Sequence, residues 1–287
     1  MDYIQLKAMA KINLGLDVTG KRADGYHELR MVMQMVNLYD KITITVTEEP
    51  GIHITTNLSF LPVNENNIVY KAAQMLIDEF DIKNGVDIVL EKHIPVAAGM
   101  AGGSSDGASV LYGLNKLFQL GLSRKELMER GVRLGADVPY CILRTTALSE
   151  GIGEILTTLP PMPKCFILVA KPPVSVSTKA VFGKLNLKEV NQHPDIDGIV
   201  EAVKAGDLYG IADRLGNTLE SVTIKDYPVI DEIKKIMVDN GALGALMSGS
   251  GPTVFGLYDD EDKVKAAYEI LKQGNLAKQV FLTKPVN

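Results

Sequence analysis

Apolar and polar residues alternate in two early stretches of the chain. Apolar residues occupy every second position over residues 12–18 and again over residues 42–46. This period of two predicts β-strands with one buried face. Shorter apolar runs predict further strands over residues 86–90 and 166–169, near Ala245, from Val254 and near Val280.

Apolar positions three or four residues apart predict helices elsewhere. One begins near Asn67, a second covers residues 108–118, and Ser123 with Glu126 forms a capping box that opens a third. Two more are expected over residues 228–240, where Gly241 suits a left-handed stop, and over residues 261–273. Strands and helices follow one another irregularly, which favours the α+β class over a regular strand–helix repeat.

Prolines interrupt the middle of the chain. Three prolines fall within residues 160–163, and Pro172 and Pro173 follow. Because proline cannot continue a helix or a central strand, we expect a domain boundary here. The predicted domains are residues 1–158 and 159–287.

Composition and charge narrow the functional class. The 287 residues are 46% apolar, and 30 Lys and Arg against 35 Asp and Glu give a net charge of −5. A disordered chain is excluded, and mild acidity gives no general attraction to nucleic acid or to an anionic membrane. No apolar run approaches a membrane span, and no secretory signal is visible. The only cysteines, Cys141 and Cys165, read as core residues of a cytoplasmic protein.

Glycines gather in two clusters, at residues 99–107 and 248–252. The first cluster lies between a predicted strand and a predicted helix. There the backbone can turn tightly, and Ser104 and Ser105 would open a helix whose amides attract a polyphosphate. A plain strand-to-helix loop is the alternative. Neither a Walker-type loop nor a dinucleotide Gly-x-Gly-x-x-Gly follows a strand.

A second motif overlaps the first glycine cluster. Residues 103–107 match Gly-x-Ser-x-Gly, the nucleophile elbow of a serine hydrolase, with Ser105 as nucleophile. The context disfavours this alternative, because several small residues separate the serine from the strand. His193, the only histidine after Asp137, lies in a polar turn.

Several polar residues lie where the pattern is otherwise apolar or turn-like. Lys11 and Asn13 project to one face of the first strand, either toward solvent or toward a ligand. Asp137, in Leu-Gly-Ala-Asp-Val-Pro, is either a general base or a turn-forming aspartate. Tyr26 and His27 form either a ligand clamp or an ordinary loop.

Four segments, taken in order, resemble one family. They are residues 10–29 (AKINLGLDVTGKRADGYHEL), the glycine-rich loop at 95–108, residues 134–139 (LGADVP) and residues 247–255 (MSGSGPTVF). Together they are similar to the 4-diphosphocytidyl-2-C-methyl-D-erythritol kinases. These enzymes belong to the superfamily of galactose, homoserine, mevalonate and phosphomevalonate (GHMP) kinases. The first segment separates this family from its relatives.

The resemblance implies a two-domain α+β fold. Its N-terminal ATP-binding domain would be like a domain of a ribosomal protein, and its C-terminal domain would be ferredoxin-like. It also implies ATP and Mg²⁺ as cofactors. The γ-phosphoryl group would move to the 2-hydroxyl of a cytidyl diphosphate sugar alcohol, a step of the non-mevalonate isoprenoid route. Homoserine and mevalonate kinases are the close alternatives, and a nucleotide-binding module without transfer is a more distant one.

The resemblance also implies residue roles. Asp137 would accept or orient the proton of the attacking hydroxyl, and Lys11 would sit beside it and offset developing charge. Asn67 and Lys92 would line the adenine pocket, and Ser104 or Ser105 would reach Mg²⁺. Other nucleotide contacts would come from Pro95, Ala98, Gly99, Ala101, Gly102, Gly103, Ser104 and Ser105. The cytidyl substrate would contact Asn13, Tyr26, His27, Phe182, Gly249 and Gly251.

The nucleotide loop departs from the expected pattern. It reads Ala98-Gly-Met-Ala-Gly-Gly, where Gly-Gly-Leu-Gly-Gly-Gly or a close variant is expected. Alanine tolerates a positive φ poorly, so the assigned phosphate contacts would fail if Ala98 and Ala101 both need left-handed backbone. Asp106 adds a negative charge and is expected to point away from the phosphates. The sequence indicates neither the oligomeric state nor roles for His53, His93 and His193.

Overall fold

The computed structural model describes residues 2–190 and 192–286. The chain forms two compact units. Unit 1 takes the residues up to Ala10, Leu38–Val96 and Ala101–Arg144, and unit 2 takes Lys11–Asn37, Ala97–Met100 and the residues from Thr145 onward. These units reflect packing within the fold. The linear boundary at residues 158 and 159 is a different partition and stays a prediction.

Two long strands supply residues to both units. They are β1 (Tyr3–Lys21) and β2 (His27–Thr47), which are hydrogen-bonded neighbours. Both predicted early strands are confirmed, but each is only part of a longer one. The expectation of one exposed face is wrong over residues 12–18, because every residue from 10 to 18 is buried. The polar residues in this part of β1 face the protein interior, so a pattern of period two predicts the strand but not the exposure of its polar face.

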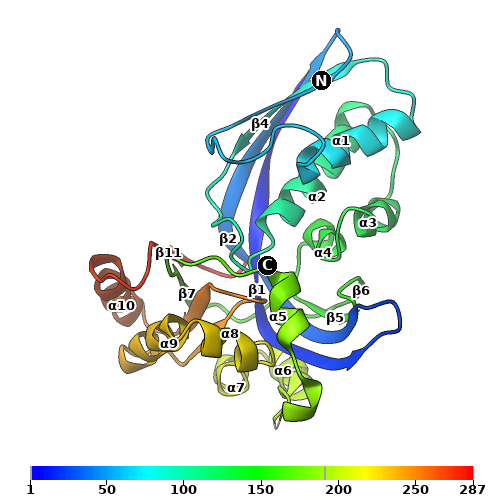
Figure 1. Ribbon diagram of the computed structural model, residues 1–287. Coiled ribbons are helices and arrows are strands. Elements are labelled where there is room, and N and C mark those ends of the chain that lie inside the picture. Colours follow the sequence, from blue (N-terminus) through cyan, green and yellow to red (C-terminus); the bar gives the residue numbers. More distant parts are fainter. Residues whose placement is uncertain (1, 191, 287) are drawn as a thin grey trace. The chain divides into compact units, whose positions relative to one another are not determined.

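In unit 1, α-helices lie against one side of a group of β-strands. β3 (Ile52–Thr56) runs parallel to β4 (Gly85–Glu91), and β4 pairs antiparallel with β2, with Ile42 opposite Leu90. Figure 1 shows the helices of unit 1 together on one side of these strands. They are α1 (Ile68–Glu79), α2 (Gly102–Leu117), α3 (Arg124–Val132) and α4 (Val138–Leu143).

Local signals explain where the helices of unit 1 begin. Asn67 is the N-cap of α1, and Ser123 with Glu126 forms the expected capping box of α3. The helix expected from residue 108 begins earlier, at Gly102. Glycines and serines carry little helix signal of their own, so the first turn of α2 is not visible as a pattern.

Unit 2 is built around an antiparallel sheet in the order β11–β7–β10–β9. These strands are β11 (Gln279–Thr283), β7 (Phe166–Lys171), β10 (Val254–Tyr258) and β9 (Gly244–Met247). α9 (Val229–Asp239) packs on β9 and β10, and α10 (Glu261–Gln273) packs on β7 and β11. All of these strands and helices were predicted, and Gly241 has the expected left-handed φ of 89°.

Unit 2 also contains smaller strands. β5 (Ala147–Gly151) pairs antiparallel with β2 and with β6 (Ile155–Thr158). β8 (Gly216–Asn217) pairs parallel with β1 at Gly15 and Leu16. The sequence pattern predicted none of these three strands, because their sequences, ALSEG, ILTT and GN, contain no sustained apolar run.

Several short helices of unit 2 were not predicted either. They are α5 (Thr178–Lys184), a 3₁₀ turn η1 (Leu187–Glu189), α6 (Ile196–Ala205), α7 (Leu208–Asp213) and α8 (Glu220–Asp226). Their N-caps were a usable signal, because Ser177, Asp195 and Asp207 each accept a backbone hydrogen bond. Among the described residues, no helix is long and apolar enough to cross a bilayer.

Candidate active site

The first candidate residues lie on β1 in unit 2. Lys11 is 4% exposed and Asn13 is fully buried, and the Lys11 ammonium donates a 2.7 Å hydrogen bond to Asn13 Oδ1. The Asn13 amide in turn lies 3.4 Å from Met31 Sδ. The two side chains share one face of the strand, as predicted, and the solvent-facing alternative for Lys11 is wrong. A lysine buried inside a strand needs polar partners to keep its charge.

The first glycine cluster makes a loop of left-handed residues. Gly99 has a φ of 72°, and two alanines join it, Ala97 at 51° and Ala101 at 54°. Ala98 is not among the left-handed residues. The phosphate contacts were expected to fail if Ala98 and Ala101 were both left-handed. Only Ala101 is, so this condition is not met. The Lys11 backbone N–H holds the loop by donating to the Met100 carbonyl at 3.1 Å.

The start of α2 is open to an anion. Its N-cap is Ala101, which has no side-chain oxygen and makes no cap hydrogen bond. The first amides of a helix lack partners within the helix, and the helix dipole adds positive potential there. Gly103 is exposed and Ser104 is half-buried. This arrangement fits a phosphate group, which supplies the acceptors that the cap does not.

Ser105 does not fit a hydrolase nucleophile. It lies within α2, its N–H bonds the Ala101 carbonyl at 2.9 Å, and it is 2% exposed. A nucleophile elbow presents its serine at an exposed strand-to-helix turn. The Gly-x-Ser-x-Gly match is therefore a coincidence of the glycine-rich helix start.

The second glycine cluster contacts the first within unit 2. Gly249 and Gly251 have φ values of 57° and 84°. The Ser248 hydroxyl donates a 2.9 Å hydrogen bond to the Gly99 carbonyl. A Cβ atom added to Gly99 would lie 2.0 Å from the Ser248 carbonyl oxygen. Close backbone packing between the two clusters thus explains Gly99, alongside any approach to a ligand.

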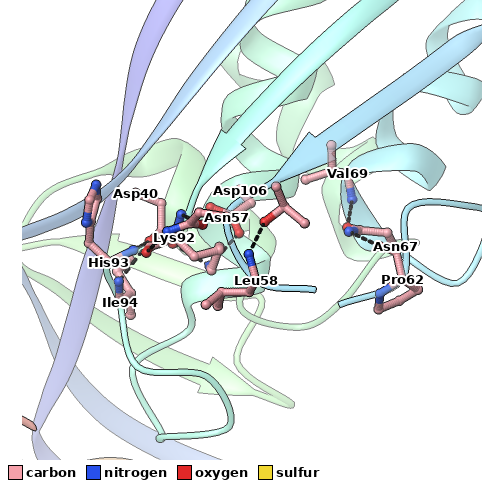
Figure 2. Close-up of polar contacts among 11 residues, drawn as sticks. Asp40, Asn57, Leu58, Pro62, Asn67, Val69, Lys92, His93, Ile94 and Asp106 are labelled. Carbon is pink, nitrogen blue, oxygen red and sulfur yellow. Dashed lines mark hydrogen bonds and ion pairs between the residues drawn. The ribbon is translucent and has the colours of Figure 1, made fainter. Parts of the chain in front are cut away.

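A buried ionic cluster of Asp40, Lys92 and Asp106 lies in unit 1 (Figure 2). The Lys92 ammonium hydrogen-bonds both carboxylates, at 2.6 Å to Asp106. Asp40 also accepts from the backbone N–H groups of His93, at 2.5 Å, and Ile94, at 2.8 Å. Burial raises the pKa of Asp106 well above its usual value, and the nearby Asp40 adds to this against the pull of Lys92.

This cluster changes the interpretation of Lys92 and Asp106. The Lys92 ammonium, predicted to line the adenine pocket, is held by two buried carboxylates. Asp106 was expected to point away from the phosphates, and it points inward to Lys92. Sequence reasoning missed Asp40. The available signal was an aspartate in the middle of a strand, where acidic residues are rare.

Asn67 and Asn57 fix the backbone near this cluster (Figure 2). Asn67 Oδ1 accepts from the Val69 N–H at 2.9 Å, and its amide donates to the Pro62 carbonyl at 2.7 Å. Asn57 bonds both the N–H and the carbonyl of Lys92, at 2.8 and 3.0 Å. The Asn67 oxygen thus caps α1 while its amide holds the preceding loop at Pro62, and its adenine contact stays a prediction.

Asp137 precedes α4 in unit 1. It occupies the N-cap position, is half-buried, and makes no side-chain cap hydrogen bond. Both interpretations of Asp137, as general base and as turn-forming aspartate, stay predictions. Tyr140, one turn later, is fully buried, and its hydroxyl has no partner among the described residues. Burial, with smaller effects of Cys141 and Asp137, raises the pKa of Tyr140.

Comparison with known proteins identifies the family. Residues 67–145 match the model of the GHMP kinase N-terminal domain, and residues 199–276 match that of the C-terminal domain. A 4-diphosphocytidyl-2-C-methyl-D-erythritol kinase of Lachnospira eligens is 58% identical over 284 residues, covering 99% of each chain. One of Lachnoclostridium phytofermentans is 60% identical, covering 99% of this chain and 98% of the other. The chain belongs to the 4-diphosphocytidyl-2-C-methyl-D-erythritol kinase family.

Solved structures agree with the family fold. A crystal structure of a 4-(cytidine 5'-diphospho)-2C-methyl-D-erythritol kinase has a TM-score of 0.85 at 31% identity, covering 99% of this chain and all of the other. The homoserine kinase of Cytophaga hutchinsonii has a TM-score of 0.80 at 22% identity, covering 99% and 95%. The second likeness shows the fold alone. The predicted α+β GHMP kinase fold is confirmed.

Residues expected at the cytidyl end of this GHMP kinase meet in unit 2. The rings of His27 and Phe182 stack with centroids 5.0 Å apart and planes 29° apart. Tyr26, the neighbour of His27, is 59% exposed. Burial and the nearby Lys21 lower the pKa of His27, so the neutral imidazole predominates at pH 7.

One polar cluster of this kinase was not anticipated. Asp17 follows Lys11 and Asn13 along β1 and is 7% exposed. Its Oδ1 lies 2.7 Å from His193 Nδ1 and accepts a 2.8 Å hydrogen bond from the Thr218 hydroxyl. His193, which had no assignable role, thus ties the chain before α6 to β1. The polar position of Asp17 within a buried strand was the available signal.

Proposed function

We propose that this GHMP kinase transfers the γ-phosphoryl group of ATP to the 2-hydroxyl of 4-diphosphocytidyl-2-C-methyl-D-erythritol. This is a step in non-mevalonate isoprenoid precursor biosynthesis, and we place it in the cytoplasm. The observation that carries the proposal is the identity of 58% with the Lachnospira eligens kinase over 99% of both chains. The open N-terminus of α2 supports it, because a kinase must hold polyphosphate.

Phosphoryl transfer depends on positioning and charge stabilisation more than on covalent help. We assign the proton of the attacking hydroxyl to Asp137, which is half-buried at the N-cap position of α4. We assign charge stabilisation at the reacting oxygens to Lys11, which Asn13 holds by a 2.7 Å hydrogen bond. A fixed ammonium stabilises charge that develops in the transition state without reorganising.

The α2 N-terminus would hold the nucleotide. The amides of Gly102, Gly103 and Ser104 would bind phosphate oxygens, and Ala97–Met100 leads into this turn. Mg²⁺ neutralises phosphate charge and prefers oxygen ligands. Ser104 is half-buried whereas Ser105 is 2% exposed, so Ser104 is the hydroxyl that we assign to the metal.

The cytidyl group would bind in unit 2. The stacked rings of His27 and Phe182, together with Tyr26, offer aromatic faces for a pyrimidine. A neutral His27 can both donate to and accept from the Watson–Crick edge of cytosine. We assign the remaining contacts to Asn13 and to the backbone of the second glycine cluster at Gly249 and Gly251.

A substrate panel tests the proposal. Purified protein with MgATP would be given the cytidyl substrate, homoserine or mevalonate, and ADP would be measured by a coupled assay. We expect ADP formation only with the cytidyl substrate. Turnover of homoserine or mevalonate alone would place the chain with the other superfamily kinases. ATP binding without turnover of any alcohol would indicate a non-catalytic module.

Substitution of Asp137 tests the assigned base. We expect Asp137→Asn to lower kcat by about 10²–10⁴-fold, because that is the usual contribution of a general base. ATP affinity, measured by calorimetry, should stay within about twofold, since the side chain is assigned to the alcohol. Unchanged kcat would remove Asp137 from the mechanism.

A further inference from the structure

Asn217 is a buried polar residue outside the residues assigned to ligands. It is 7% exposed and ends β8, where it pairs with Leu16 of β1. The next residue extends this pairing, because the Thr218 N–H donates to the Leu16 carbonyl at 2.9 Å. β1 therefore fixes the position of Asn217.

The whole Asn217 carboxamide is engaged by backbone groups. Its Nδ2 donates to the carbonyls of Met247 and Gly249, both at 2.8 Å. Its Oδ1 accepts from the Leu219 N–H at 3.0 Å. One amide proton is thus directed at the second glycine cluster and the other at the residue just before it, whereas the oxygen accepts from the turn into α8. This side chain orders the backbone around it.

The second glycine cluster passes this order to the first. Ser248 lies between the two carbonyls that Asn217 holds, and its hydroxyl donates to the Gly99 carbonyl at 2.9 Å. The clearance is small, since a Cβ on Gly249 would lie 3.0 Å from the Gly99 oxygen. A shift of the backbone at Ser248 must therefore displace Gly99.

We infer that Asn217 is a positioning residue for the nucleotide loop: it holds Met247 and Gly249 so that Ser248 keeps Gly99 in place. The Lys11 N–H bond to Met100 holds the neighbouring residue of the same loop at 3.1 Å. The strand β1 thereby positions the loop in two ways, directly through the Lys11 N–H and indirectly through its pairing with β8. This role rests on the proposed function, since the loop is the one assigned to ATP.

Asn217→Asp separates this role from a general contribution to stability. Aspartate keeps the acceptor for Leu219 but loses both amide protons and turns a carboxylate oxygen toward two carbonyls. Asn115→Asp is the matched control. Asn115 is also buried at 8%, donates to the Leu122 carbonyl at 2.9 Å and accepts from its N–H at 3.0 Å. It lies at the far end of α2 from the loop.

We expect Asn217→Asp to lower kcat/KM for ATP by roughly 10- to 100-fold, as expected when binding groups are displaced by about 1 Å. Asn115→Asp should stay within about threefold of the parent. Backbone hydrogen exchange over residues 97–103, measured without substrate, should accelerate in Asn217→Asp only. Equal losses of kcat/KM in both variants, or unchanged exchange in Asn217→Asp, would overturn the inference.

The hydrogen-exchange measurement tests the role of Asn217 independently of the proposed function, because it needs no turnover. A wild-type protein without kinase activity would defeat the proposed function, whereas the exchange comparison would still decide the role of Asn217. If Asn217→Asp does not fold, Ser248→Ala replaces it, since this variant removes only the hydroxyl that bonds Gly99. Faster exchange over residues 97–103 in Ser248→Ala would support the inference, and unchanged exchange would contradict it.

Discussion

The two glycine clusters solve the same backbone problem with different residues. In the second cluster, both left-handed positions are glycines, Gly249 and Gly251. Around the first, two of the three left-handed positions, Ala97 and Ala101, are alanines, and only Gly99 is glycine. Gly99 is the position where a Cβ would meet backbone, 2.0 Å from the Ser248 oxygen. Close approach therefore demands glycine more strictly than a positive φ does.

The clusters also differ in the groups that hold them. The carbonyls of the second cluster accept from neutral groups, the Asn217 amide and the Thr223 hydroxyl. The first cluster is held by ion pairs, because Asp106 lies within it and binds Lys92, which also binds Asp40. Only an ionic support contains groups that titrate, so the two supports should respond differently to pH.

The largest effect is expected from Gly99→Ala. The added Cβ would overlap the Ser248 carbonyl, and alanine would be strained at a φ of 72°. Together these predict a loss of roughly 3–5 kcal/mol in the free energy of unfolding. Urea denaturation would measure it. A loss below about 1 kcal/mol would show that the clusters can move apart.

Gly249→Ala should cost less. Its φ is 57°, and the added Cβ would lie 3.0 Å from the Gly99 oxygen, so a small shift relieves the contact. We expect a loss of about 2 kcal/mol, most of it from the left-handed backbone. Urea denaturation of Gly249→Ala and Gly99→Ala under the same conditions gives the comparison directly. A larger loss than at Gly99 would reverse the order that close approach predicts.

Asp106→Asn should change how stability depends on pH. The pKa of Asp106 is raised on folding, so the folded state binds its proton more tightly. The resulting contribution of Asp106 to the free energy of unfolding is fully present below the unfolded pKa near 3.8. It is lost as the pH rises through the pKa of the folded state. Asparagine resembles the protonated acid and should remove this loss, so the free energy of unfolding of the variant should rise relative to that of the wild type as the pH rises.

Denaturation between pH 4 and pH 8 would test this. The wild-type protein should lose stability relative to Asp106→Asn as the pH rises. A constant difference across that range would mean that Asp106 does not titrate. Thr223→Val, which removes a neutral support of the second cluster, serves as the control and should show a constant difference.

The smallest effect is expected from Ala101→Gly. Glycine relieves the left-handed strain at a φ of 54°, but it also makes the unfolded chain more flexible. These contributions oppose each other, so we expect a gain of up to about 1 kcal/mol, with kinase activity within about twofold of the wild type. Thermal denaturation would measure it. A clear loss of stability would show that the Ala101 methyl group has packing contacts that outweigh the strain.

Much of the fold follows from sequence patterns with strong local causes. The capping box of Ser123, the N-cap of Asn67 and the stop at Gly241 each lie where local chemistry predicts. The short helices α5 to α8 did not show as patterns, because fewer than three turns give little periodicity. The glycine-rich start of α2 was hidden for a different reason, since glycine has no apolar face to repeat.

The candidate site likewise contains residues that local motifs predict and contacts that they do not. Motifs identified Lys11, Asn13, His27 and Phe182, and the structure pairs the first two by a hydrogen bond and the last two by stacking. The inward orientation of Asp106 and the contact of His193 with Asp17 depend on partners 14 and 176 residues away. No local pattern encodes such partners, so only the folded chain reveals them.

Phosphorus NMR of the product formed from MgATP and 4-diphosphocytidyl-2-C-methyl-D-erythritol tests the central claim most directly. The account predicts a new phosphomonoester signal that grows in equal amount with ADP, while the diphosphate signals of the cytidyl substrate persist. Release of inorganic phosphate without a new phosphomonoester, or no loss of the ATP γ-phosphate signal, would contradict it.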